Sequence, residues 1–163
     1  MRTNNSKVKN TIISVYFILI VLAVILATVF KAFHDVTSNP TLTFLLIAFG
    51  FAALFFLVHF ISKYFEYDSD GLKVVIINRG LLLSEQLNYR EHRIEFEKQQ
   101  LYAFKFNNFI IYKTLTLYLK DSHGHKFKST FNVTLVPRKK RRYIRQSLGK
   151  MIKMNKKSAQ INE

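Results

Sequence analysis

Two uncharged apolar runs in the first part of the chain limit its fold more than any other feature. Residues 10–30 contain no charged side chain, and residues 42–61 contain only one ionisable group, His59. An α-helix rises about 1.5 Å per residue, so each run is long enough to cross a hydrocarbon core of about 30 Å. Backbone polar groups in lipid must be paired within their own segment. We therefore expect two transmembrane helices, over about 11–31 and 42–62.

The charges that flank these runs predict the direction in which the chain crosses the membrane. Arg2, Lys7 and Lys9 precede the first run, the connector 31–41 is near-neutral, and the chain after Lys63 ends strongly basic. Cationic segments stay in the cytoplasm, so we expect a multi-pass protein of the cell (inner) membrane with both termini cytoplasmic. A cleaved signal peptide is the alternative for the first run. However, the run exceeds the usual apolar length of about 7–15 residues, and no A-x-A site follows it.

Small residues indicate how the two helices could pair. Ala23 and Ala27 are four residues apart, as are Ala48 and Ala52. In an antiparallel hairpin Ala23 comes level with about residue 49. Small side chains allow membrane helices to approach closely, so we expect the helices to meet there.

Beyond residue 62 the apolar pattern changes from continuous to alternating. Residues 114–119, for example, read Thr-Leu-Thr-Leu-Tyr-Leu, which is typical of a half-buried antiparallel strand. The polar sequence 121–124 indicates a hairpin turn after this strand. Residues 109–112 fit either the end of the preceding strand or the turn before the next one. The seven expected strands are 64–67, 72–78, 81–90, 94–97, 101–106, 114–119 and 126–133.

The C-terminal segment has helical periodicity. Pro137 suits the first turn of a helix, and the apolar residues Ile144, Leu148, Met151 and Ile152 recur at helical spacing. We expect an amphipathic helix over about 137–153 that packs on the sheet. The expected domains are a two-helix anchor over 1–62, a cytoplasmic β domain over 63–154, and a frayed polar tail over 155–163.

Several short motifs resemble the bacterial membrane-tethered pleckstrin-homology-like (PH-like) proteins. These motifs are Asp68-Ser69-Asp70-Gly71-Leu72, the turn Asn78-Arg79-Gly80-Leu81-Leu82, and the terminal helix that opens at Pro137. The resemblance implies an α+β membrane protein with an antiparallel β-barrel or sandwich of about seven strands, capped by the helix. It also implies a binding or scaffolding module rather than a reaction. Eukaryotic phosphoinositide-binding members carry a basic cluster in the turn where this chain has Asp68 and Asp70, so their mode of headgroup recognition is not expected.

The sequence predicts no catalytic, cofactor-binding or metal site. Cysteine is absent, which excludes disulfides, thiolate nucleophiles and Cys-based metal centres. His123 and His125, with Asp121 nearby, lack a third ligand of fixed geometry and are interpreted as a polar turn. Glu95 and Glu97 are interpreted as surface charges. Without a phosphate-binding loop, nucleophile elbow or dinucleotide fingerprint, we expect a protein that is not an enzyme.

A cationic run is the strongest functional candidate. The net charge is +15, and residues 122–162 contain no Asp or Glu but 12 of the 25 Lys and Arg. A segregated basic segment indicates an anionic partner. Anionic lipid headgroups rank first because the anchor places the domain beside the bilayer; an acidic protein or self-association ranks second, and nucleic acid third. A solvated charged face is the remaining alternative. The residues of the candidate anionic-surface site are Arg138, Lys139, Lys140, Arg141, Arg142 and Arg145.

Overall fold

The computed structural model describes residues 1–33, 39–81 and 91–161. They form two compact units. We call Lys7–Phe60 the helical unit, and Met1–Ser6 together with Ile61–Glu163 the β unit.

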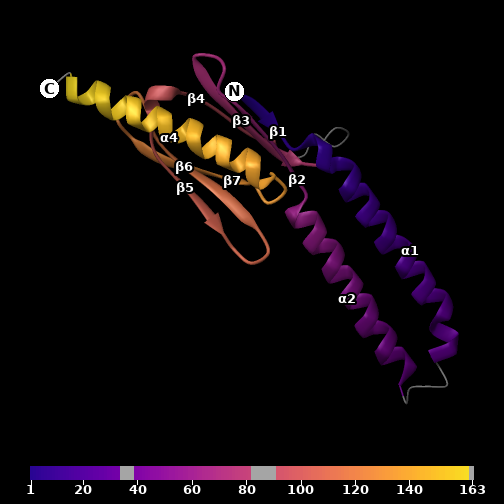
Figure 1. Cartoon of the computed structure of the whole chain (residues 1–163). Coiled ribbons are helices and arrows are strands. Elements are labelled where there is room, and N and C mark those ends of the chain that lie inside the picture. The colour runs from indigo at the N-terminus through magenta and orange to yellow at the C-terminus, as the bar shows by residue number, and fades with distance from the viewer. Residues whose placement is uncertain (34–38, 82–90, 162–163) are drawn as a thin grey trace. The chain divides into compact units, whose positions relative to one another are not determined.

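The helical unit consists of two long apolar helices, α1 (Lys9–Phe33) and α2 (Pro40–Ile61), shown in Figure 1. Their apolar side chains are exposed around the helices; Phe49 and Phe56, for example, are each 75% exposed. A helix that presents apolar side chains on all sides is not suited to water. By length and composition both are candidate membrane-spanning helices, at the positions that the sequence predicts.

The described part of the β unit contains seven antiparallel strands in two sheets (Figure 1). The four-stranded sheet has the order β1-β2-β3-β4, and the three-stranded sheet the order β5-β6-β7. The strands are β1 (Arg2–Asn4), β2 (Lys63–Asp68), β3 (Lys73–Gly80), β4 (His92–Glu97), β5 (Leu101–Asn108), β6 (Lys113–Lys120) and β7 (Lys126–Asn132). A short 3-10 turn, η1 (Ser6–Val8), precedes α1, and a second, η2 (Lys98–Gln100), joins β4 to β5.

Six of the seven predicted strands correspond to β2–β7. The predicted strand over 81–90 lies almost wholly outside the described residues, apart from Leu81, which is a buried bend residue. Residues 109–112 form the turn between β5 and β6. The predicted turn after β6 is also present: Asp121 N donates to His125 O at 2.9 Å, and Gly124 adopts φ +85°, a conformation that favours glycine.

The hydrophobic core is made by the alternating apolar residues of the strands and by one face of α4 (Arg138–Ile161). Ile144 and Leu148 are fully buried, and Met151 is 8% exposed. These three residues have the i, i+4, i+7 spacing of one helix face, as the sequence predicts. The C-terminal helix therefore packs on the β structure and belongs to its core.

The C-terminal helix extends further than predicted, to Ile161. The prediction of a frayed tail from Asn155 is wrong at that residue. Asn155 Nδ2 donates to Lys98 O and Leu101 O, both at 2.8 Å. The amide thus satisfies carbonyl groups around η2 and ties the helix to the sheet.

The N-terminal residues form an unpredicted edge strand. Strand β1 pairs with β2, Arg2 opposite Asp68 and Asn4 opposite Glu66. Residues 1–6, which the sequence predicts to be part of the two-helix anchor, belong to the β unit. The helical unit is thus an insertion between two adjacent strands, in the place of a hairpin loop.

Buried Asn5 joins the two chain segments that lead into the helices. Its side chain is an acceptor for Phe65 N at 2.8 Å and a donor to Lys63 O at 2.9 Å. Asn5 N also donates to Phe65 O at 3.2 Å. The chain therefore leaves the β unit for α1 and returns from α2 at neighbouring positions. We call this end, formed by Asn5 and Ser62, the tether end of the β unit.

Candidate anion-binding groove

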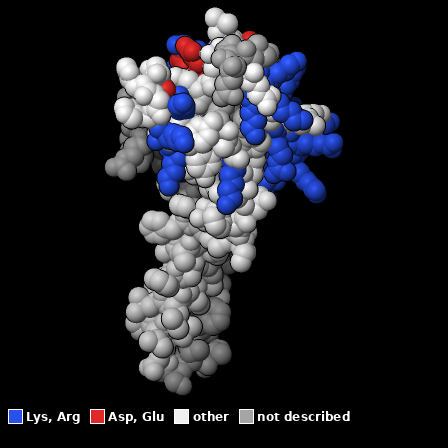
Figure 2. Space-filling view, turned by 90° about the vertical axis from the view of Figure 1, so that its left-hand side faces the viewer, with Lys and Arg blue, Asp and Glu red and all other residues white. Residues whose placement is uncertain are grey.

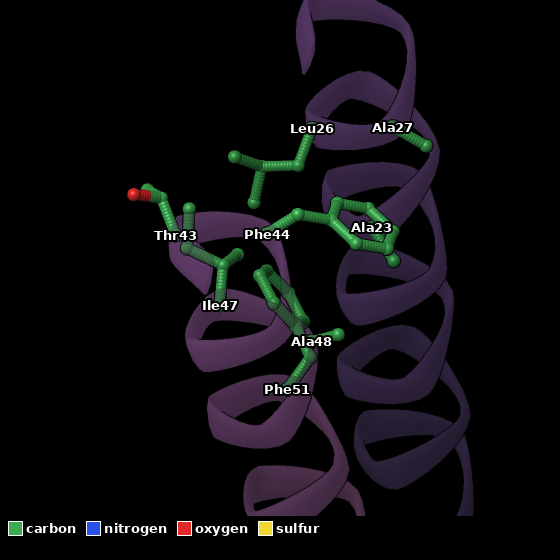
Figure 3. Close-up of a pocket in the computed structure, with 8 residues that line it drawn as sticks. All are labelled: Ala23, Leu26, Ala27, Thr43, Phe44, Ile47, Ala48 and Phe51. Carbon is green, nitrogen blue, oxygen red and sulfur yellow. The ribbon is translucent and has the colours of Figure 1, made fainter. Parts of the chain in front are cut away.

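The helical unit has an apolar pocket of about 240 Å³ between α1 and α2 (Figure 3). The predicted small residues Ala23, Ala27 and Ala48 line it, and Phe44 points from α2 toward α1 (Figure 3). Its one polar side chain, Thr43, donates its hydroxyl to Asn39 O of the same helix turn at 3.3 Å. This lining has no group that could act as an acid, a base or an ion ligand.

The β unit has an open cationic groove of about 1410 Å³ between the β5–β6 hairpin and the start of α4. Figure 2 shows Lys and Arg side chains gathered at the right-hand side of the β unit and scattered among other residues over the rest of the visible face, with acidic side chains near its top. We call the site the basic groove. Its lining residues are Phe106, Asn108, Lys113, Arg138, Lys139, Arg141, Arg142, Tyr143, Arg145 and Gln146.

Helical geometry gathers most of the predicted cations on one side of α4. Arg138, Arg141, Arg142 and Arg145 have the spacing i, i+3, i+4, i+7, which places them on the same helix face. Lys139 also lines the groove. The opposite face carries Ile144 and is anchored in the core, so the cationic face is held at the surface.

Arg141 is the most unusual cation of the groove. Its Nε is buried, and no described residue accepts a hydrogen bond from it. Burial lowers the pKa of the Arg141 guanidinium, and repulsion from Arg138 and Arg145 lowers it further. Arginine still remains charged at neutral pH. A partly buried charge with an unpaired donor is costly, and an anion in the groove would remove that cost.

The position of the run on its helix increases the repulsion. The first turn of α4 contains no acidic residue and begins with five consecutive cations. The N-terminus of a helix carries a partial positive charge, so cations are unfavourable and anions favourable there. None of the described lining residues is acidic. The groove thus concentrates positive charge without compensation from the described residues around it.

Two lysines show where the structure differs from the predicted site. Lys140 belongs to the predicted run but does not line the groove; its Nζ donates to Asn4 O at 2.5 Å and ties α4 to β1. Lys113 was not predicted and lines the groove from the start of β6. The aromatic residues Phe106 and Tyr143 also line the groove, although neither belongs to the predicted site. The Arg145 Cζ atom lies 5.2 Å from the centre of the Phe106 ring, in a cation–π contact.

The groove lies at the tether end of the β unit. The Lys140–Asn4 bond places the start of α4 beside the segment that leads into α1. On the other side, Asn78 Nδ2 donates to Tyr64 O at 2.9 Å and to Asn132 O at 3.0 Å, which links β2 to the end of β7. Val133 N then donates to Lys113 O of the groove at 2.9 Å. The segments that lead to both helices and the basic groove therefore share one end of the β unit.

The opposite end carries several of the acidic residues. Asp68 ends β2, at the other end of the strand from Lys63, and Asp70 lies in the β2–β3 turn that follows. Asp121 lies in the β6–β7 turn, at the other end of β6 from Lys113. The charge separation seen in the sequence is therefore also a separation in space.

The other polar clusters remain ordinary surface groups. Glu95 forms ion pairs with Lys73 at 3.4 Å and with Arg93 at 3.9 Å. His123 and His125 are exposed in the β6–β7 turn. Within residues 1–33, 39–81 and 91–161, no group of three or more His, Cys, Asp or Glu residues could hold a metal ion.

Comparison of the chain with protein-family models, with curated proteins and with solved structures gives no match.

Proposed function

We propose that this protein is an integral membrane protein that presents a basic, PH-like binding or scaffolding domain at the cytoplasmic membrane surface. In this proposal the basic groove binds the anionic headgroups of lipids and catalyses no reaction. One observation carries the proposal: a groove whose described lining has five cations of the predicted run and no acidic residue lies at the end of the β unit from which two apolar helices continue.

The short connections support a lipid partner. Only Ser62 separates the end of α2 from the start of β2. If the apolar helices span the bilayer, the tether end has little freedom to move away from the headgroups. Each Lys or Arg near an anionic leaflet contributes about 1 kcal/mol, and the interaction is screened over about 8 Å at physiological salt. Five residues of the predicted run line the groove, which makes a combined contribution of several kcal/mol possible at close contact.

The pairing of β1 with β2 supports the proposed topology. These strands flank the two helices and belong to one sheet, so both flanks lie on the same side of a membrane crossed by the helices. The cationic flanks and the basic groove favour the cytoplasmic side.

The test uses the full chain in neutral detergent micelles. Short-chain phosphatidylglycerol or phosphatidylcholine is added, and unfolding of the β unit is followed by near-ultraviolet circular dichroism. A ligand at 100 times its Kd stabilises the folded state by about 2.7 kcal/mol. We expect the melting temperature to rise with phosphatidylglycerol and to stay constant with phosphatidylcholine.

Two variants with equal changes in net charge locate the site. The groove variant replaces Arg138, Arg141, Arg142 and Arg145 with Gln. The control variant replaces the exposed cations Lys150, Lys153, Lys156 and Lys157 with Gln, further along the same helix.

We expect the groove variant to lose the response to phosphatidylglycerol and the control to keep it. Equal responses in both variants would refute the proposed site. If an acidic protein or a nucleic acid, but not phosphatidylglycerol, stabilises the unaltered chain, the lipid proposal is wrong.

A further inference from the structure

The turn between β5 and β6 is an ordered but exposed apolar tip. Phe109 is 49% exposed, Ile111 is 54% exposed, and Ile110 is fully exposed at 105%. The turn is closed by a hydrogen bond from Phe109 N to Tyr112 O at 2.9 Å. The rings of the same two residues stack with their centres 4.5 Å apart. We call residues 109–111 the apolar tip.

The composition of this turn is unusual for a surface hairpin. The β2–β3 connection, residues 69–72, contains one exposed apolar residue, Leu72, and the β6–β7 connection, residues 121–125, contains none. Contiguous exposed apolar surface of this kind marks an interaction site.

The tip lies at the tether end of the β unit. Asn108 directly precedes the tip, and Lys113 follows it after Tyr112; Asn108 and Lys113 both line the basic groove. Lys113 O accepts the hydrogen bond from Val133 N, next to the Asn132–Asn78–Tyr64 bridge that leads to β2. The turn is thus next to the cationic groove and at the end where the chain continues into α1 and α2.

Apolar residues with a cationic rim match the chemistry of a membrane interface. Aliphatic and aromatic side chains enter the boundary between headgroups and acyl chains, while Lys and Arg contact the anionic headgroups. Tyr143, which is 43% exposed in the groove, adds an amphipathic ring to this surface. All the charged residues that line the neighbouring groove are Lys or Arg, which matches the charge of an anionic lipid surface.

We infer that the apolar tip inserts into the lipid interface and acts as a third membrane contact of the chain, in addition to the two helices. This inference rests on the proposed function, since the same surface would bind headgroups through the basic groove. Together, tip and groove would hold the β unit in one orientation on the bilayer.

The test exploits the absence of Trp from the chain. The variant Ile110→Trp places the only Trp at a fully exposed position, where a larger side chain meets no steric barrier. The matched control is Leu72→Trp, since Leu72 is 92% exposed and lies in the β2–β3 turn at the opposite end of the β unit. Each full-chain variant is reconstituted in vesicles of phosphatidylcholine with phosphatidylglycerol. Some vesicles carry lipids with a quencher at a shallow or a deep acyl position.

We expect the Ile110→Trp emission to shift to shorter wavelength and to be quenched most by the shallow label. The Leu72→Trp emission should keep the wavelength of a Trp in water and resist both labels. Addition of Ile111→Asp to the Ile110→Trp chain should reduce the quenching, because a charge at the tip opposes insertion. Ile110→Trp emission equal to that of the control would overturn the inference.

Two further outcomes separate this inference from its alternatives. A blue shift without lipid quenching, lost in nanodiscs that hold one copy, would overturn it in favour of contact with a second copy.

The groove variant is tested independently by the response of its melting temperature to phosphatidylglycerol. If that response depends on the groove while Ile110→Trp is not quenched, headgroup binding stands and the inserted tip is refuted. If the tip is quenched while the groove variant behaves as its control, the tip stands and the proposed headgroup site fails.

Discussion

Asn5 offers the sharpest test of the architecture, because one side chain joins the two segments that lead into the helices. It is 1% exposed and forms two side-chain hydrogen bonds with the backbone of β2, at Phe65 N and Lys63 O. Asn5→Ala would leave both groups without that partner. An unsatisfied buried donor or acceptor costs about 1–3 kcal/mol. Phe65 is fully buried and Lys63 is partly buried. We therefore expect the loss of both hydrogen bonds to lower the free energy of unfolding by about 2–4 kcal/mol.

The loss can be measured on the full chain in neutral detergent. One kcal/mol shifts the melting temperature of a domain of about 100 residues by roughly 4–8 °C, so even the lower value predicts a fall of about 8 °C or more. Near-ultraviolet circular dichroism follows the β unit, whose Tyr rings include buried Tyr67. Limited proteolysis should show earlier cleavage of the same variant.

Two companion variants make the result specific. Asn4→Ala is the matched control, since in the described part of the chain the Asn4 side chain accepts hydrogen bonds only locally, from Ser6 N and Oγ. It should change stability by no more than about 0.5 kcal/mol. Asn5→Asp keeps an acceptor for Phe65 N but turns an oxygen toward Lys63 O, so it should also destabilise. If the Asn5→Ala and Asn4→Ala variants have the same melting temperature, Asn5 does not hold together the segments that lead into α1 and α2.

Two further predictions concern charge and pH. Arg141→Met removes an unpaired buried donor and should raise stability by about 1 kcal/mol without anionic lipid, while weakening the response to phosphatidylglycerol; a lower melting temperature would contradict the unpaired state. Burial and a hydrogen bond to Glu66 raise the pKa of Tyr64 to about 12, above its unfolded value of about 10. The stability that this shift contributes is present below pH 10 and is lost as the pH rises toward 12. Melting curves across this range should therefore fall less steeply for Tyr64→Phe than for the unaltered chain.

The sequence by itself determined the elements whose pattern is local. Two uncharged runs specified α1 and α2, because length and hydropathy are properties of the segment alone. The alternation of Leu115, Leu117 and Leu119 predicted a strand with those residues inside, and all three are fully buried. Leu148 was placed in the core by helical spacing for the same reason. Charge segregation also identified most cations of the basic groove.

The tertiary structure alone decided the pairings between distant segments. Strand β1 has only three residues and no alternation, and its partner lies more than sixty positions along the chain. Lys140 was indistinguishable from its neighbours in sequence, yet its direction on α4 brings it to Asn4 O rather than to the groove. Lys113 enters the groove because β6 starts beside α4. The spacing of apolar residues along a strand or helix predicts which of its faces is buried. Which polar groups meet there depends on geometry that exists only after the elements have packed, since hydrogen bonds require specific distances and angles between groups far apart in the chain.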